Sequence, residues 1–223
     1  MATKAAVERT GPGVVEAQFA RVASEGSARH PQLVALLTAA GPNAARDLAD
    51  AVHLLCHLYG RHPGLIDLAL QGTAAGTAHD WLKDAADAFE RERLYLVRLT
   101  AAVGPQPSTA GSAQTEGTLL AQRHALETLA TSERHGCALG AATALVEDWR
   151  SVRDLLDRAA TRAGLDLPPC TLPDAESVAQ AIRAGADTPG AERALAFGSE
   201  QLLLQHRGLF DLLEARASAR GDY

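Results

Sequence analysis

The sequence predicts an all-α protein, a single-domain helical bundle of about four longer helices plus three or four short helices. Apolar residues recur at helical spacing over long stretches, and none of these stretches alternates as a β-strand does. Hydrophobic residues make up 47% of the 223 residues, which is enough for one large core. Aromatic residues make up only 4%, a composition that suits close packing between helices. We therefore expect one domain over residues 14–218, with flexible ends at 1–13 and 219–223.

Glycine, proline and capping residues set the expected helix limits in the first part of the chain. A short helix is expected over residues 14–24, and Pro31 should begin another helix that ends before Gly41. Asn43 is expected to cap a third helix over residues 44–59. Short helices of this kind should cover the ends of a bundle formed by the longer ones.

Three features define the middle of the chain. The segment Arg61–Ile66 nearly repeats Arg29–Val34, and both segments contain a proline that suits a helix start. An old duplication and the independent reuse of a good helix start both explain this repeat. The first long helix is expected over residues 78–103. The polar residues 104–114, which contain two prolines, are expected to form a loop.

Residues 118–162 contain strong helix formers and no proline. As one helix they would be far longer than usual, so we expect a kink or break near Gly136. Gly136 and Gly140 also leave a surface with little side chain, against which another helix or a flat ligand can pack. A short helix over residues 173–184 and a final helix capped by Thr188 should follow.

Helical periodicity places several polar or reactive side chains on faces that should be buried. The stretch 118–162 has one apolar stripe, which consists of Leu119, Leu126, Ala130, Cys137, Ala141, Ala144, Val152, Leu155 and Ala159. Glu133 and Asp148 lie on the same stripe. Arg93 and His206 lie on the apolar faces of the helices expected before and after it. The candidate buried polar cluster is therefore Arg93, Glu133, Cys137, Asp148 and His206, near the joint at Gly136 and Gly140.

Burying any of these groups without a partner would be costly, so we expect them to pair. Arg93 with Glu133 or Asp148 is the expected ion pair, because a guanidinium can bind a carboxylate through two hydrogen bonds. One interpretation is a ligand or catalytic pocket with Cys137 as a nucleophile. The other is a structural ion pair with a hydrogen-bonded core histidine, in which case Arg93→Ala should cost about 3 kcal/mol.

A metal site is a separate hypothesis. His53 and His57 are four residues apart on one helix, and His124 and Glu127 are three apart. A bundle with such pairs resembles the ferritin-like di-iron proteins, which implies iron, manganese or zinc. However, His124 and Glu127 stand in the reverse of the Glu-x-x-His order of that family, and His53 and His57 should face away from the apolar face of their helix. We expect no cofactor, with one of these metals as the alternative.

An all-α chain of this length also resembles the haem-oxygenase-like proteins, including the thiaminase II-type hydrolases. The resemblance implies a central cysteine and a late glutamate as the groups that carry the chemistry, here Cys137 and Glu200 by position. The tyrosines that the hydrolases place beside the cysteine are missing. The comparison therefore concerns the fold more than the reaction.

Charge and composition limit the partners. The formal net charge is -6 and the basic residues are scattered, so we do not expect nucleic acid binding. No apolar run is long enough to span a membrane. Cys56, Cys137 and Cys170 are far apart, as is typical of a chain in a reducing, cytoplasmic compartment.

Two hypotheses of function remain open. The first is a helical bundle that binds a small ligand or a protein partner, which includes a homodimer. The second is an enzyme, metal-dependent or cysteine-dependent, that uses the inward-facing histidine, carboxylate and cysteine side chains. The sequence identifies no substrate for either.

Overall fold

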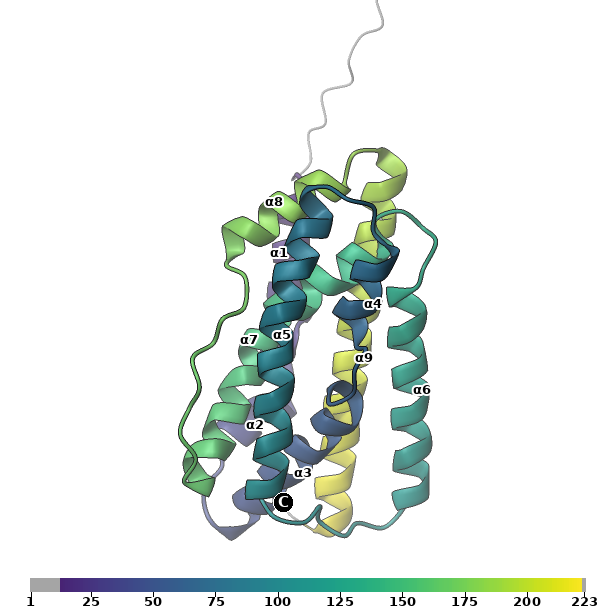
Figure 1. The fold of residues 1–223 in the computed structure, drawn as a ribbon. Coiled ribbons are helices and arrows are strands. Elements are labelled where there is room, and N and C mark those ends of the chain that lie inside the picture. Colours follow the sequence, from purple (N-terminus) through teal and green to yellow (C-terminus); the bar gives the residue numbers. More distant parts are fainter. Residues whose placement is uncertain (1–12, 222–223) are drawn as a thin grey trace, which may run out of the picture.

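The computed structural model describes residues 13–221, and the expected flexible end at 1–13 lies almost wholly outside this range. The described chain is all α-helical, which confirms the predicted fold class (Figure 1). Among the described residues, five helices are long: α3 (Pro42–Tyr59), α5 (Thr77–Ala102), α6 (Ser112–Ala130), α7 (Cys137–Ala163) and α9 (Pro189–Arg220). They are one more than expected, because residues 118–162 divide between α6 and α7.

Short helices cover the ends and flanks of the bundle. They are α1 (Val14–Glu25), α2 (Pro31–Thr38), α4 (Leu65–Gly72) and α8 (Ala175–Gly185), with one 3-10 turn, η1 (Ser27–Arg29). The expected cap at Thr188 is present, since its side chain accepts a hydrogen bond from the Ala191 amide. The expected cap at Asn43 is wrong, because α3 already begins at Pro42 and Asn43 lies in its first turn. At the other end, α9 continues to Arg220, two residues into the segment expected to be flexible.

The break between α6 and α7 covers residues 131–136. Gly136 ends it with a φ of 93°, a left-handed conformation that glycine adopts without strain. Because the helix stops at Ala130, the helical phase of α6 does not continue into α7. Glu133 therefore lies in the connection, where it is exposed. The prediction that Glu133 faces the core is wrong, whereas every apolar residue of the predicted stripe is buried.

The two longest helices, α7 and α9, cross at almost the closest approach that two backbones permit. A Cβ added at Gly140 would lie 2.0 Å from the carbonyl oxygen of Leu195, and one added at Gly198 would lie 2.0 Å from that of Cys137. Glycines on both helices thus let the backbones touch. The close packing expected at Gly140 is confirmed, and the surface packed against it is helix α9 (Figure 1).

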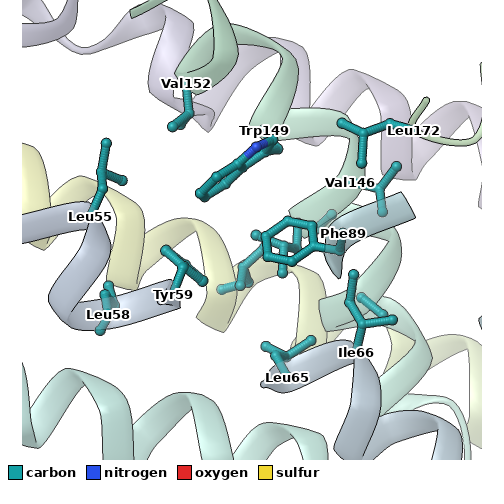
Figure 2. Close-up of a cluster of buried hydrophobic side chains, with 14 of the residues drawn as sticks. Leu55, Leu58, Tyr59, Leu65, Ile66, Phe89, Val146, Trp149, Val152 and Leu172 are labelled. Carbon is teal, nitrogen blue, oxygen red and sulfur yellow. The ribbon is translucent and has the colours of Figure 1, made fainter. Parts of the chain in front are cut away.

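Three aromatic rings lie at the centre of the bundle. The ring centroids of Tyr59 and Trp149 are 5.1 Å apart, and those of Phe89 and Trp149 are 4.8 Å apart (Figure 2). The rings come from α3, α7 and α5, so one cluster joins three helices that are distant in sequence. This packing fixes the end of α3 and positions the Tyr59 side chain for the site described below.

None of the helices within residues 13–221 is both long and apolar enough to cross a lipid bilayer.

Candidate functional site

Four buried polar residues meet in the interior, each from a different part of the chain. Ser27 comes from η1, Tyr59 from the end of α3, Asp148 from α7 and His206 from α9. Each is at most 5% exposed. We call these four residues the core cluster. Two of them, Asp148 and His206, belong to the polar cluster predicted from the sequence.

The core cluster is a continuous chain of hydrogen bonds. The His206 ring lies between Asp148 and Tyr59, with its Nδ1 atom 2.5 Å from Asp148 Oδ2 and its Nε2 atom bonded to the Tyr59 hydroxyl. Ser27 binds the same carboxylate twice. Its amide donates to Oδ1 at 2.7 Å and its hydroxyl donates to Oδ2 at 2.5 Å. Buried polar groups are thus satisfied by one another, as a stable interior requires.

The buried environment shifts the pKa values of two residues of the core cluster, Asp148 and Tyr59. Burial raises the pKa of Asp148, but hydrogen bonds from His206 and Ser27 and the interaction with the His206 ring outweigh it, so that the pKa is lowered. Burial, together with the negative charge of Asp148, raises the pKa of Tyr59. The Asp148 carboxylate accepts a hydrogen bond from Nδ1–H of His206, and the other ring nitrogen, Nε2, accepts one from the Tyr59 hydroxyl. This arrangement gives each of the three groups a hydrogen-bond partner.

A cavity of about 900 Å³ opens beside the core cluster, between the end of α3, the following segment 60–64, α4 and α6. Apolar side chains from all these helices and from α5 line it: Leu58, Leu65, Leu68, Phe89, Leu120 and Leu126. Its polar lining comes mainly from segment 60–64 and from α6. Tyr59 belongs to both features, since it lines the cavity while its hydroxyl binds His206.

An ion-pair cluster anchors one wall of this cavity. Arg93 on α5 binds Asp67 on α4 at 2.8 Å, and it also contacts Glu90 and the ring of His62. Asp67 in turn accepts a hydrogen bond from the Gly64 amide at 2.8 Å. The cluster therefore ties segment 60–64 to α4 and α5.

The structure separates the five residues that the sequence placed in one cluster. Arg93 is buried as predicted, but its carboxylate partners are Asp67 and Glu90, and the predicted pairing with Glu133 or Asp148 is wrong. The reason is that Arg93 points to the α4 side of α5. Cys137 is 1% exposed and packs in the apolar core at the close crossing with α9. The joint at Gly136 and Gly140 is filled by backbone, so the polar cluster lies further along α7.

The four metal candidates do not converge. The Nε2 atom of His53 donates a hydrogen bond to the Gly104 carbonyl oxygen at 2.8 Å, because a carbonyl oxygen can only accept. His57, His124 and Glu127 are exposed, and the last two lie on the rim of the cavity. Within residues 13–221, the structure has no group of three or more histidine, cysteine or acidic residues arranged to hold a metal ion.

Sequence reasoning missed Ser27 and Tyr59. Ser27 lies in a 3-10 turn, where helical periodicity gives no signal, and Tyr59 shares the apolar face of its helix with Val52 and Leu55, as an ordinary core residue does. One local signal exists at Gly26, where an added Cβ would lie 2.5 Å from Asp148 Oδ1. Only glycine therefore allows the turn to approach the buried carboxylate.

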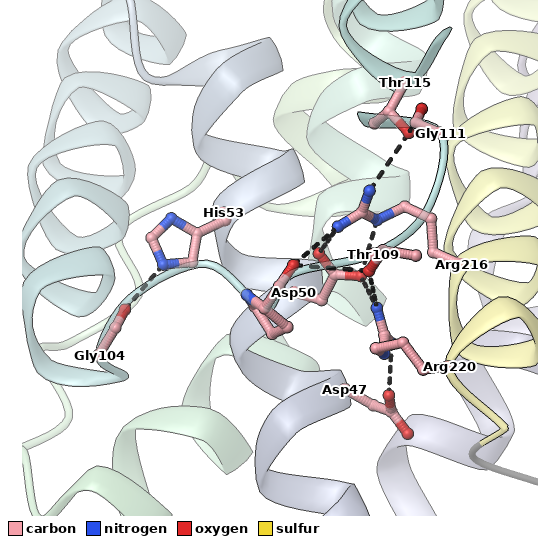
Figure 3. Close-up of polar contacts among 10 residues, drawn as sticks. Asp47, Asp50, His53, Gly104, Thr109, Gly111, Thr115, Arg216 and Arg220 are labelled. Atoms are coloured by element: carbon pink, nitrogen blue, oxygen red, sulfur yellow. Dashed lines mark hydrogen bonds and ion pairs between the residues drawn. The ribbon is translucent and has the colours of Figure 1, made fainter. Parts of the chain in front are cut away.

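A second buried polar cluster was also missed, at the end of the bundle where α9 finishes (Figure 3). Asp50 is fully buried and receives two hydrogen bonds from Arg216, at 2.8 and 2.7 Å. Arg220 binds the same carboxylate at 2.6 Å and Asp47 at 2.6 Å. Both arginines also contact the connection between α5 and α6, through Thr109 and Pro107. This cluster therefore fastens the connection onto α3 and α9.

Comparison with known proteins places the chain in one family. Residues 22–221 match the model described as Family of unknown function (DUF6975), and the chain belongs to that family. The match includes all four residues of the core cluster and every residue that lines the cavity. No curated protein and no solved structure matches the chain.

Proposed function

We propose that this member of the DUF6975 family binds a small molecule with a largely apolar body in the cavity between α3, α4 and α6. The cavity itself carries the proposal. Its volume of about 900 Å³ falls within the range of small-molecule sites, roughly 300–1,000 Å³. Its walls are leucine and phenylalanine side chains, with polar groups gathered at the rim. This distribution is typical of sites that bury an apolar ligand and orient it through a few polar contacts.

The rigidity of the surroundings supports the same function. The cavity floor includes Tyr59 and Phe89, and both rings are fixed by contact with Trp149. The Arg93–Asp67 pair anchors the wall formed by segment 60–64. A preformed cavity lowers the ordering cost of binding.

Catalysis by the core cluster has less support. An acid or base must reach the reacting atom, whereas Asp148 and His206 are at most 2% exposed and Tyr59 already uses its hydroxyl to bind His206. Cys137 is equally inaccessible.

A reducing, cytoplasmic location is also part of the proposal. The small number of cysteines, which lie far apart in the sequence, favours it.

Titration with the neutral fluorescent probe N-phenyl-1-naphthylamine tests the proposal. Its two linked aromatic ring systems are apolar and small enough for the cavity. Thr128 is exposed, lies on the cavity lining and bonds its hydroxyl to the carbonyl of His124. Thr128→Trp should place an indole ring in part of the cavity, with little effect on the fold, and weaken probe binding at least tenfold.

Thr161→Trp is the matched control. Thr161 is also an exposed helical threonine whose hydroxyl bonds to the carbonyl four residues before, but it lies on α7 away from the cavity. This variant should bind the probe as the wild type does. If the wild type does not bind the probe, or if both tryptophan variants bind it equally, the cavity is not the binding site.

A further inference from the structure

We infer that the ligand of this cavity carries an anionic oxygen group, which Arg123 binds at the rim. The inference rests on the proposed function and names the chemical class of the ligand: an apolar small molecule with one oxyanion, such as a carboxylate or sulfonate. Three observations support the inference. They are the hydrogen bonding of Arg123, the charges around the rim, and the apolar character of the buried lining.

Arg123 is oriented by the protein and still has a donor to offer. It lies on α6 and lines the cavity, and one of its terminal nitrogens donates to the carbonyl of His57 at 3.0 Å. Its Nε atom is buried and has no acceptor among the described residues. Among the described residues the guanidinium makes only the one hydrogen bond to His57, so its other terminal N–H donors can bind a ligand oxyanion at the rim. Because one bond already fixes the guanidinium, binding a ligand would cost little further side-chain entropy.

The rim of the cavity is positively charged on a protein that is negative as a whole. Arg61 and Arg123 line it against a single carboxylate, Glu127, and His62 and His124 lie beside them. The whole chain has a formal net charge of -6. Two further acidic residues of this region, Asp67 and Glu90, are bound to Arg93. The positive charge at the rim is therefore a local feature that favours an anion.

The buried part of the lining is apolar, and the charged side chains lie in its more exposed part, which also includes Leu120. Leu58, Leu65 and Phe89 are buried and form the inner wall, whereas Arg61 and His124 are exposed at the mouth. A ligand that matches both parts has an apolar body inside and its charge outside, where water still reaches it. This placement avoids the large cost of burying an isolated anion.

Two probes with the same apolar body test the inference. 8-Anilinonaphthalene-1-sulfonate is N-phenyl-1-naphthylamine with one added sulfonate, so the ratio of their dissociation constants measures the contribution of the anion. In the wild type the sulfonate should bind roughly tenfold more tightly, as one charged hydrogen bond provides. Arg123→Gln should remove this preference and leave binding of the neutral probe within about twofold.

Arg162→Gln is the control for the change of charge. Arg162 is exposed on α7 and, like Arg123, donates to a backbone carbonyl, that of Gly41. This variant should retain the preference for the sulfonate. If the wild type binds both probes equally, or if Arg123→Gln keeps the preference, the inference is wrong while the proposed function stands. If neither probe binds, or if Thr128→Trp leaves both affinities unchanged, the proposed function fails as well.

Discussion

The Asp148 carboxylate and the His206 ring are joined at 2.5 Å in the interior, although the two residues are 58 positions apart in the chain. Asp148 lies on α7 and His206 on α9, the two helices that make the most extensive contact in the bundle. A buried Asp–His pair can form only when α7 and α9 are rotated so that these two residues face each other. We interpret the pair as a device that fixes how α7 and α9 are aligned, in addition to the close contact of their glycines.

Replacement of Asp148 by asparagine should destabilise the protein by about 3 kcal/mol. The amide cannot carry the negative charge that accepts hydrogen bonds from His206 and Ser27, and its NH2 group would place a donor against another donor. Urea unfolding followed by circular dichroism measures this loss as a lower transition midpoint. The matched control is Asp154→Asn on the same helix, where the carboxylate is exposed. A loss below about 1 kcal/mol for Asp148→Asn would show that the pair contributes little.

Low pH should lower the free energy of unfolding of the wild type more than that of Asp148→Asn. The pKa of Asp148 is lowered in the folded protein, so its contribution to stability is complete above the ordinary aspartate pKa of about 3.9 and is lost as the pH falls through the lower folded value. The free energy of unfolding of the wild type should therefore fall on acidification from about pH 4. Urea titrations at several pH values should show a smaller fall in Asp148→Asn. Equal slopes would mean that other carboxylates cause the acid sensitivity.

The burial of individual residues was predictable where a helix is regular. Arg93, Asp148 and His206 were all correctly placed inside, because the helical period relates each residue to the apolar residues of its own helix. The same reasoning fails across the break at 131–136. Glu133 was assigned to the core only because the phase of α6 was extended through residues that are not helical.

The partners of the buried residues were not predictable, since they depend on how helices rotate against one another. Arg93 binds Asp67 because α5 turns that face to α4, and no pattern within either helix shows it. Asp50 and Arg216 are 166 residues apart and likewise meet only through tertiary packing. A cavity is even harder to predict from sequence, because it forms where side chains from several helices leave space unfilled.

Two glycine-to-alanine substitutions, at Gly140 and Gly117, should change the stability of the protein in opposite directions. Gly140→Ala places a Cβ 2.0 Å from the carbonyl oxygen of Leu195, so α7 and α9 must separate and the variant should lose about 3 kcal/mol. Gly117 lies within α6, is exposed and has no atom within 4 Å of an added Cβ. Gly117→Ala should therefore gain about 0.5–1 kcal/mol from helix propensity. Thermal unfolding measures both, and a stable Gly140→Ala variant would contradict the close crossing.

The cluster at the end of α9 predicts that Arg216→Ala destabilises the protein by about 3 kcal/mol, because it leaves the fully buried Asp50 with Arg220 as its remaining arginine. The connection between α5 and α6 should also exchange its amide hydrogens faster, since Arg216 donates a hydrogen bond to the Pro107 carbonyl. Arg193→Ala on an exposed site of the same helix is the control and should change stability by less than about 0.5 kcal/mol. Adding Asp50→Asn to Arg216→Ala should restore part of the stability if the loss comes from the incompletely neutralised Asp50 carboxylate, and none if it comes from lost packing.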